Sequence, residues 1–188
     1  NGQVGITYMG CAPDSEGVGC MWGGIGLAYA DHPLGPFTKV AEPVLALGKA
    51  NEWDSLAIHE HTLNKLENGT YLLFYTGYDG NGDQGGLATS EDLITWQKHP
   101  ENPVLKHVHD RTQWDGIHRR PRSLNKVGDT WYCLYEGATI DRRSTLETDC
   151  FRDSIGIARS KDLIKWETHP LQVHLPQQPG ANFDSIWT

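Results

Sequence analysis

Several features that would define other classes of protein are scarce in this sequence of 188 residues. It has two methionines, and no apolar run approaches the roughly 18 residues of a membrane-spanning helix, which excludes such a segment. Basic residues are outnumbered, with 16 Lys and Arg against 24 Asp and Glu. The net charge of −8 argues against a nucleic acid or an anionic membrane as partner.

Cysteines are also few, and their spacing fits no zinc-binding template. There are four of them: Cys11, Cys20, Cys133 and Cys150. The first two flank a Gly-rich loop and the last two flank another loop, so each pair can close a local disulfide. Four free, partly buried thiols are the alternative.

Glycine, proline and large aromatic residues are abundant: 21 Gly, 10 Pro, 7 Trp and 7 Tyr. Short aromatic segments separated by Gly and Pro turns are typical of an all-β protein. We therefore expect an all-β fold.

Three strings recur in the same order along the chain, which indicates an internal repeat. The first is a Trp-Asp or Phe-Asp string, the second an aromatic strand that ends in Gly, and the third a Gly-apolar-Ala strand followed by a polar turn and an aromatic residue. The first string starts at Glu52, Gln113 and Asn182; the second spans Asn1–Gly10, Asn68–Gly77 and Gly128–Gly137; the third starts at Gly26, Gly86 and Gly156. A Pro-Val-Leu string follows the third at Pro43 and Pro103.

One repeat thus predicts four short strands, and a four-stranded antiparallel unit repeated radially is a propeller blade. We expect blades at residues 1–48, 52–106 and 113–176, and the start of a fourth at 182–188. An open arc leaves sheet edges exposed. The expected partial propeller is therefore a piece of a longer chain or an arc completed by self-association. Unrelated hairpins in a β-sandwich are the alternative.

The strings YLLFYTG, GLATSEDLITWQK and NPVL resemble the blades of glycoside hydrolase family 43 and its relatives, families 32, 117 and 130. The turn ADHPLGPFTK at 30–39 is similar to one common in family 43. The resemblance implies a five-bladed propeller that binds sugar at the mouth of a funnel. Three carboxylates on the first strands of successive blades would then act as base or nucleophile, pKa modulator and general acid.

The carboxylate motifs of that family are altered here. The second blade has His59-Glu60-His61 in the corresponding stretch, and the third has Pro121 preceded by Arg120 in place of a carboxylate. The first strand of the leading blade, where the family carries its base, would precede Asn1.

Residues that recur in every blade are expected to be structural, and residues that break the repeat are better site candidates. The recurring tryptophans are expected in the core: Trp53, Trp96, Trp114 and Trp166. Asp54, Asp115 and Asp184 also recur. Each either caps a turn with its carboxylate or, for Asp54 and Asp115, points into the funnel as a catalytic or sugar-binding group.

The repeat is broken by a basic group on the two complete first strands, and these residues are the candidate substrate-binding side chains: His59, His61, His118, Arg119, Arg120 and Arg122. Strand alternation places His59 and His61 on one face and Glu60 on the other. Such a cluster can hold an anion or a carboxylate-bearing sugar, or it can pair with the surplus acids. A metal held by His59, His61 and His118 is a weaker alternative.

Glu136 is the third candidate catalytic carboxylate, with Asp54 and Asp115. It occupies the repeat position of Met9 and Thr76 and is the ionisable residue of the three. Burial among tyrosines would raise its pKa and suit a general acid. The alternative is a rim residue bonded to a neighbouring Arg. The loops 11–24 and 139–153 are candidate lids over the funnel.

These patterns predict hydrolysis of glycosidic bonds in an oligo- or polysaccharide at the funnel, without a metal or other cofactor. The alternatives are a phosphate-dependent glycoside phosphorylase, with phosphate held by the Arg and His cluster, and a non-catalytic carbohydrate-binding propeller. A secreted or periplasmic location is favoured over a cytoplasmic one.

Overall fold

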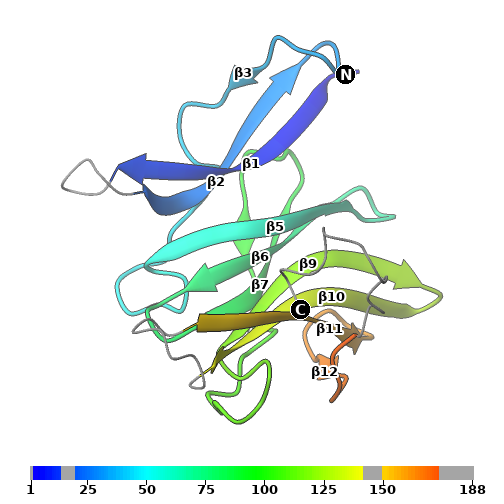
Figure 1. Ribbon diagram of the computed structural model, residues 1–188. Helices are drawn as coiled ribbons and strands as arrows, with labels where there is room; N and C mark the ends of the chain where they lie inside the picture. The colour runs from blue at the N-terminus through cyan, green and yellow to red at the C-terminus, as the bar shows by residue number, and fades with distance from the viewer. Residues whose placement is uncertain (1, 14–19, 142–149, 174–188) are drawn as a thin grey trace, which may run out of the picture.

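The computed structural model describes residues 2–13, 20–141 and 150–173, and in these ranges the chain is all-β. Twelve strands form three consecutive groups of four, stacked as three layers (Figure 1). Within these ranges no helix long and apolar enough to cross a membrane is found. We call the three groups the first, second and third blade.

The first blade consists of β1 (Val4–Pro13), β2 (Cys20–Ala30), β3 (Thr38–Lys39) and β4 (Leu45–Ala46). β1 and β2 pair antiparallel, and the two short strands β3 and β4 both pair with β2 on its other edge. The fourth strand of the expected blade is thus present in two pieces.

The second blade consists of β5 (Ala57–Lys65), β6 (Tyr71–Tyr78), β7 (Asp83–Ser90) and β8 (Gln97–Lys98). The four strands pair antiparallel in chain order, as an up-and-down blade requires. A parallel bridge between Gly23 of β2 and Ile58 of β5 joins the first two blades into one eight-stranded sheet.

The third blade consists of β9 (His118–Val127), β10 (Thr130–Asp141), β11 (Cys150–Ser160) and β12 (Glu167–Thr168). These strands form a separate four-stranded sheet in the order β12-β11-β10-β9, again antiparallel. Residues 182–188, where the start of a fourth blade was expected, lie outside the described residues. So does much of the expected lids at 11–24 and 139–153.

The polar turn of the third repeated string closes the hairpin between strands three and four. The Asp92 carboxylate accepts hydrogen bonds from the backbone N–H groups of Ile94 and Thr95, and Trp96 Nε1 donates to the Leu93 carbonyl. Leu93 has a positive φ of 67°, which these bonds hold in place. The third blade repeats every one of these bonds with Asp162, Ile164, Lys165, Trp166 and Leu163.

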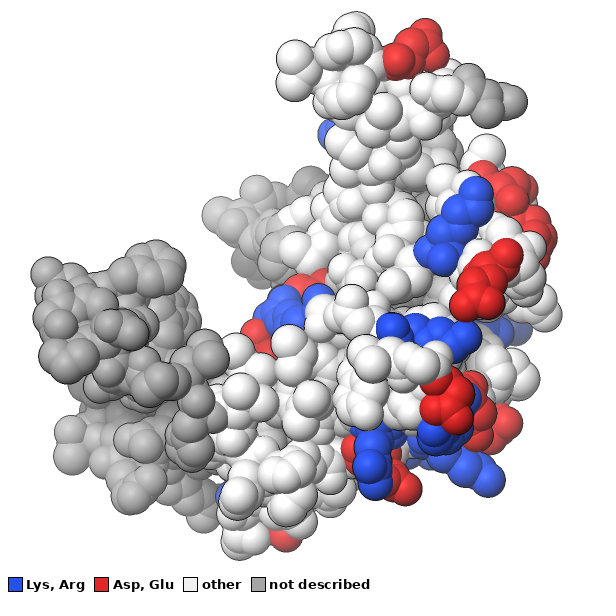
Figure 2. Space-filling model, turned by 90° about the vertical axis from the view of Figure 1, so that its right-hand side faces the viewer, with Lys and Arg blue, Asp and Glu red and all other residues white. Residues whose placement is uncertain are grey.

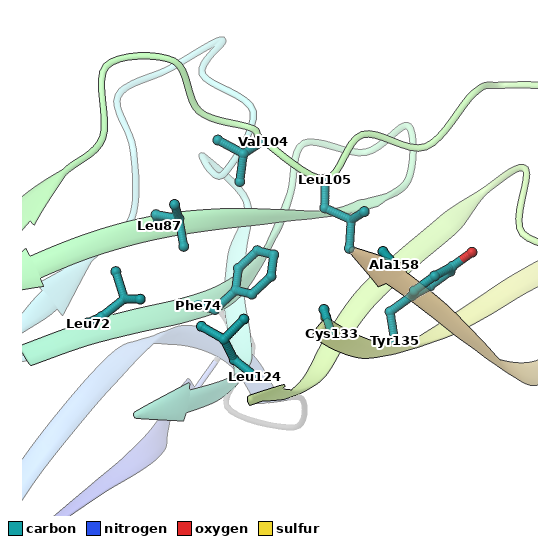
Figure 3. Packing of buried hydrophobic residues seen from close by; sticks show 9 residues of the cluster. All are labelled: Leu72, Phe74, Leu87, Val104, Leu105, Leu124, Cys133, Tyr135 and Ala158. Atoms are coloured by element: carbon teal, nitrogen blue, oxygen red, sulfur yellow. The ribbon is translucent and has the colours of Figure 1, made fainter. Parts of the chain in front are cut away.

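The hydrophobic core lies between the blades. One cluster joins the second blade to the third and is drawn in Figure 3: Leu72, Phe74, Leu87, Val104, Leu105, Leu124, Cys133, Tyr135 and Ala158. Phe74 is fully buried and stacks on Trp166, with ring centroids 5.3 Å apart. A second cluster joins the first blade to the second around Ile25, Ile58 and Tyr75. Each such buried side chain contributes about 1.5–3 kcal/mol, so apolar packing holds the blades together.

The two outer faces of the arc expose apolar positions that are buried at the inner interfaces. Leu134 of the third blade is 41% exposed, whereas Phe74, its equivalent in the second blade, is 0% exposed. Ile6 of the first blade is 43% exposed, whereas its equivalent Leu73 is 0% exposed. The described chain is therefore a partial propeller, as its repeats predict, and not a β-sandwich.

Most charged side chains lie away from these interfaces. On the face shown in Figure 2, charges of both signs gather along one side of the molecule. Two exposed ion pairs lie at hairpin turns. Lys161 Nζ is 2.5 Å from Asp129 Oδ1, and Lys126 Nζ is 3.5 Å from Glu67 Oε1. Exposed pairs of this kind contribute little to stability.

The cysteines follow neither a fully paired nor a fully reduced pattern. Cys11 takes part in a disulfide, so the alternative of four free thiols is wrong. Cys133 is free and fully buried in the core, so a disulfide between Cys133 and Cys150 is also wrong. The side chains of Cys20 and Cys150 lie outside the described part of the structure.

Candidate functional site

The two complete first strands, β5 and β9, each contain a bulge at the same height in the blade. In β5 the register with β6 shifts between Ile58 and His61, and in β9 the register with β10 shifts next to Arg122. Pro121, which cannot donate a ladder hydrogen bond, is accommodated beside the second bulge. Bulges re-aim side chains, and here they turn Glu60 and Arg122 toward a common site.

A pocket of about 410 Å³ lies at this height, lined by residues of all three blades. The lining residues are Met9, Ala57, His59, Glu60, Tyr78, Asp83, His118 and Arg120. Most of the polar ones come from β5, β7 and β9, so the pocket spans the junction between the second and third blades.

His59 is held between two carboxylates of this pocket. Its Nδ1 contacts Glu60, and its Nε2 lies 3.1 Å from Asp83 Oδ1. Because ionised carboxylates only accept hydrogen bonds, both ring nitrogens must donate, and the ring is an imidazolium. Burial opposes this charge, but the bonds to Asp83 and Glu60 outweigh it and raise the pKa of His59 to about 9.

Asp83 connects the two blades electrostatically and is 3% exposed. Its Oδ2 accepts a 2.5 Å hydrogen bond from Arg120 Nε and lies 2.8 Å from His118 Nδ1. Burial alone would raise the pKa of Asp83, but the bonds with His118 and His59 and the charge of Arg120 lower it far below the usual range. Asp83 is therefore ionised throughout the physiological pH range.

Glu136 on β10 accepts hydrogen bonds from two guanidinium groups. Arg120 Nη1 lies 2.5 Å from its Oε1, while Arg122 donates to Oε2 through Nε at 3.0 Å and through Nη2. The remaining nitrogen of Arg122, Nη1, lies 3.2 Å from Glu60 Oε1. Burial raises the pKa of Glu60, but the bond with His59 and the charges of His59 and Arg122 bring it to about 2.

These contacts close a cycle of six alternating charges, which we call the charged ring: Glu60, His59, Asp83, Arg120, Glu136 and Arg122. Three carboxylates alternate with three cations, and every carboxylate oxygen in the ring faces a cationic nitrogen. Such networks position their members more than they stabilise the fold, because each buried ion has a desolvation cost.

The prediction that His59 and His61 share a face opposite Glu60 is wrong, because the β5 bulge breaks the alternation. Glu60 joins His59 in the charged ring, whereas His61 Nε2 bonds to Thr7 Oγ1 of the first blade at 2.9 Å. Burial lowers the pKa of His61. Among the described residues no group of three His, Cys, Asp or Glu side chains is arranged to hold a metal ion, so the His59, His61 and His118 triad is not formed.

Asp54 lies outside the pocket, on the turn before β5. Its Oδ2 accepts hydrogen bonds from Tyr75 Oη at 3.0 Å and from Lys98 Nζ at 2.6 Å, and the residue is 1% exposed. A Cβ on Gly77 would lie 2.5 Å from both Asp54 and Trp53, so this glycine is required for the close approach. The Trp-Asp string thus begins in a turn, and its aspartate accepts buried hydrogen bonds from a tyrosine and a cation of the same blade. We call this arrangement the Asp lock.

Asp115 forms the same lock in the third blade. Its Oδ2 accepts from Tyr135 Oη at 2.7 Å and from Arg119 Nε at 2.9 Å, and it is 3% exposed. Arg119 also donates through Nη1 to the Lys106 carbonyl, so it too is directed away from the pocket. The geometry therefore places Asp54, Asp115 and Arg119 in structural positions and not among the pocket residues.

Of the predicted site residues, the structure brings His59, His118, Arg120, Arg122 and Glu136 together. Glu136 adopts its alternative arrangement, bonded to neighbouring arginines. Sequence reasoning missed Asp83 and misplaced Glu60. Asp83 stands three residues before Gly86 and is matched by Asp153 before Gly156 but by Gly23 before Gly26, so it neither recurs in every blade nor stands out as a break of the repeat.

Comparison with known proteins gives a match in structure but not in sequence. No protein-family model matches the chain, and no curated protein is significantly similar in sequence. Among solved structures, a glycoside hydrolase superposes with a TM-score of 0.69 at 21% identity, over 94% of this chain and 52% of the other. The chain has the fold of the propeller glycoside hydrolases.

Two further structures agree. Fructan 1-exohydrolase IIa from Cichorium intybus gives a TM-score of 0.67 at 18% identity, over 91% of this chain and 30% of the other. A family 117 glycoside hydrolase from the marine bacterium Zobellia galactanivorans gives 0.65 at 22% identity, over 93% and 44%. The resemblance of the blades is thus confirmed at the level of the fold. This chain spans about half the length of the first matched protein and less than half the length of the other two.

Proposed function

We propose that this chain forms part of a glycoside hydrolase and that the pocket with the charged ring binds a sugar residue of an oligo- or polysaccharide. The observation that carries the proposal is the charged ring itself. Four of its six members, His59, Glu60, Asp83 and Arg120, line a pocket between blades, and Glu136 and Arg122 are bonded to them. Most of the six break the repeat that accounts for the rest of the fold. The shared fold with glycoside hydrolases supports the same conclusion.

The members of the charged ring have different access to a sugar. The side chains of Glu60 and Glu136 are 27% and 19% exposed, whereas that of Asp83 is 5% exposed. We assign Glu60 and Glu136 to direct contact with the sugar. Asp83 is a positioning residue that orients His59, His118 and Arg120.

Glycosidases place two carboxyl groups across the scissile bond and keep one of them protonated as the acid. Glu60, with its pKa near 2, is suited to the ionised role, as a base or as an electrostatic partner of the oxocarbenium-like transition state. Glu136 accepts from two guanidinium groups, so the ring as it stands offers no protonated carboxyl to act as the acid. We therefore place the general acid outside the charged ring.

The absence of a protonated carboxyl from the ring also favours a second candidate, a carbohydrate-binding propeller without catalysis. The two are separated by incubating the protein with aryl glycosides and oligosaccharides while measuring sugar binding by titration calorimetry. Release of reducing sugar or aryl alcohol supports the hydrolase. Binding without turnover supports the second candidate, and turnover that requires inorganic phosphate supports a phosphorylase.

A further inference from the structure

The charge and the hydrogen-bond donors of the charged ring bear on which kind of sugar the pocket takes. Two arginines and the imidazolium of His59 give three positive charges, and Glu60, Asp83 and Glu136 give three negative charges. The ring is therefore neutral. With histidines neutral the whole chain has a formal charge of −8, and the arginines and carboxylates of the ring account for −1 of it, so the rest of the protein carries −7, whose field repels anions.

Five of the six guanidinium nitrogens of the ring already face a carboxylate. Arg122 directs all three guanidinium nitrogens at carboxylates, with Nε and Nη2 on Glu136 and Nη1 on Glu60. Arg120 directs Nε at Asp83 and Nη1 at Glu136. An anion binds strongly where it receives charge-assisted hydrogen bonds from unneutralised groups, and here it would have to displace a carboxylate that is already held in place.

We propose that the pocket is selective for an uncharged sugar residue and rejects uronic acids and inorganic phosphate. This inference rests on the proposed function for the identity of the ligand as a sugar. Its physical core, a neutral ring with committed donors, stands on the contacts alone. Sugar hydroxyls suit such a surface, because they both donate to carboxylate oxygens and accept from guanidinium groups without altering the charge balance.

The proposal predicts that removing one acid converts the pocket into an anion site. Glu136→Gln keeps the shape of the side chain but releases three nitrogens from a charged partner, Nε and Nη2 of Arg122 and Nη1 of Arg120. We expect the affinity of this variant for inorganic phosphate to exceed that of the wild type at least about tenfold. Glu60→Gln releases two nitrogens, Nη1 of Arg122 and Nδ1 of His59, so a smaller gain is expected. Glu67→Gln removes an exposed acid at a hairpin turn, where Glu67 is 92% exposed, and should leave phosphate affinity unchanged.

The test is a titration of five proteins, the wild type and the Glu136→Gln, Glu60→Gln, Glu67→Gln and Arg122→Gln variants, with inorganic phosphate and with the matched pair glucose and glucuronate. Binding is followed by calorimetry or NMR chemical shifts. Circular dichroism first establishes that each variant is folded. The expected result is no saturable binding of phosphate or glucuronate by the wild type, and saturable phosphate binding by Glu136→Gln.

Saturable binding of phosphate or glucuronate by the wild type that is lost in Arg122→Gln would overturn the proposal, and so would a folded Glu136→Gln variant that gains no phosphate affinity. Both readouts are independent of turnover. If the protein hydrolyses no glycoside, the proposed function fails while the anion titrations still decide whether the pocket is selective against charge.

Discussion

Alkaline pH should destabilise the protein through a single histidine, His59. The pKa of His59 is raised from 6.5 to about 9 in the folded state because both ring nitrogens face carboxylates. A group with a raised folded pKa contributes stability that is fully present below the unfolded pKa of 6.5 and is lost as pH rises through 9. At about 1.4 kcal/mol per pKa unit, the contribution is about 3 kcal/mol.

Urea denaturation at pH 6.5, 8 and 9.5 measures this loss as a fall in the free energy of unfolding. In His59→Gln the pH dependence over this window should largely disappear, since the titrating group is gone. His32→Gln, at an exposed turn, is the matched control and should retain the wild-type slope. A wild-type free energy of unfolding that is flat from pH 6.5 to 9.5, or an undiminished slope in His59→Gln, would refute the assignment of His59 as an imidazolium.

Three further substitutions test the fold that supports the site. Asp115→Ala leaves the Tyr135 hydroxyl and a buried guanidinium without their acceptor, so the free energy of unfolding should fall by about 3–5 kcal/mol in urea denaturation, and a fall below about 1 would contradict the lock. Gly77→Ala puts a methyl group 2.5 Å from Trp53, and the same assay should show a loss of at least about 1–3 kcal/mol. His107 is 5% exposed, and its ring nitrogens have no hydrogen-bond partner in the described structure. Burial, together with the charge of the neighbouring His109, lowers the pKa of His107 to about 4. Stability should therefore fall as pH drops below 6.5, and His107→Leu should reduce that fall; an unchanged acid limb would show that His107 does not cause it.

The fold could be predicted from the sequence because its repeat records contacts that every blade must make. Trp53 and Trp114 recur because each packs beside a buried Asp lock, and Gly77 and Gly137 recur because a Cβ would collide with those tryptophans. The Asp92 and Asp162 turns recur for the same reason, since each closes a hairpin with identical bonds. Periodic strings of this kind specify a blade whatever its function.

The site could be predicted only in part, because two of its determinants leave no mark in a repeat. A β-bulge moves Glu60 onto the same side as His59, and alternation cannot anticipate an inserted residue. Asp83 is shared with the third blade as Asp153, whereas the first blade has Gly23 at this position, so a comparison of the second and third blades alone does not single it out. Conversely, Arg119 breaks the repeat and yet has a structural role, because it donates a hydrogen bond to Asp115. In the second blade Lys98 donates the equivalent bond to Asp54.

The most direct test of a sugar-processing pocket organised by Asp83 is a comparison of glycoside turnover by the wild type, Asp83→Asn and Glu67→Gln. Asp83→Asn keeps the size of the side chain but removes the charge that holds His59 and Arg120, so kcat should fall by about a hundredfold or more while the fold is retained. Glu67→Gln should match the wild type. Undiminished turnover in a folded Asp83→Asn variant would contradict the account.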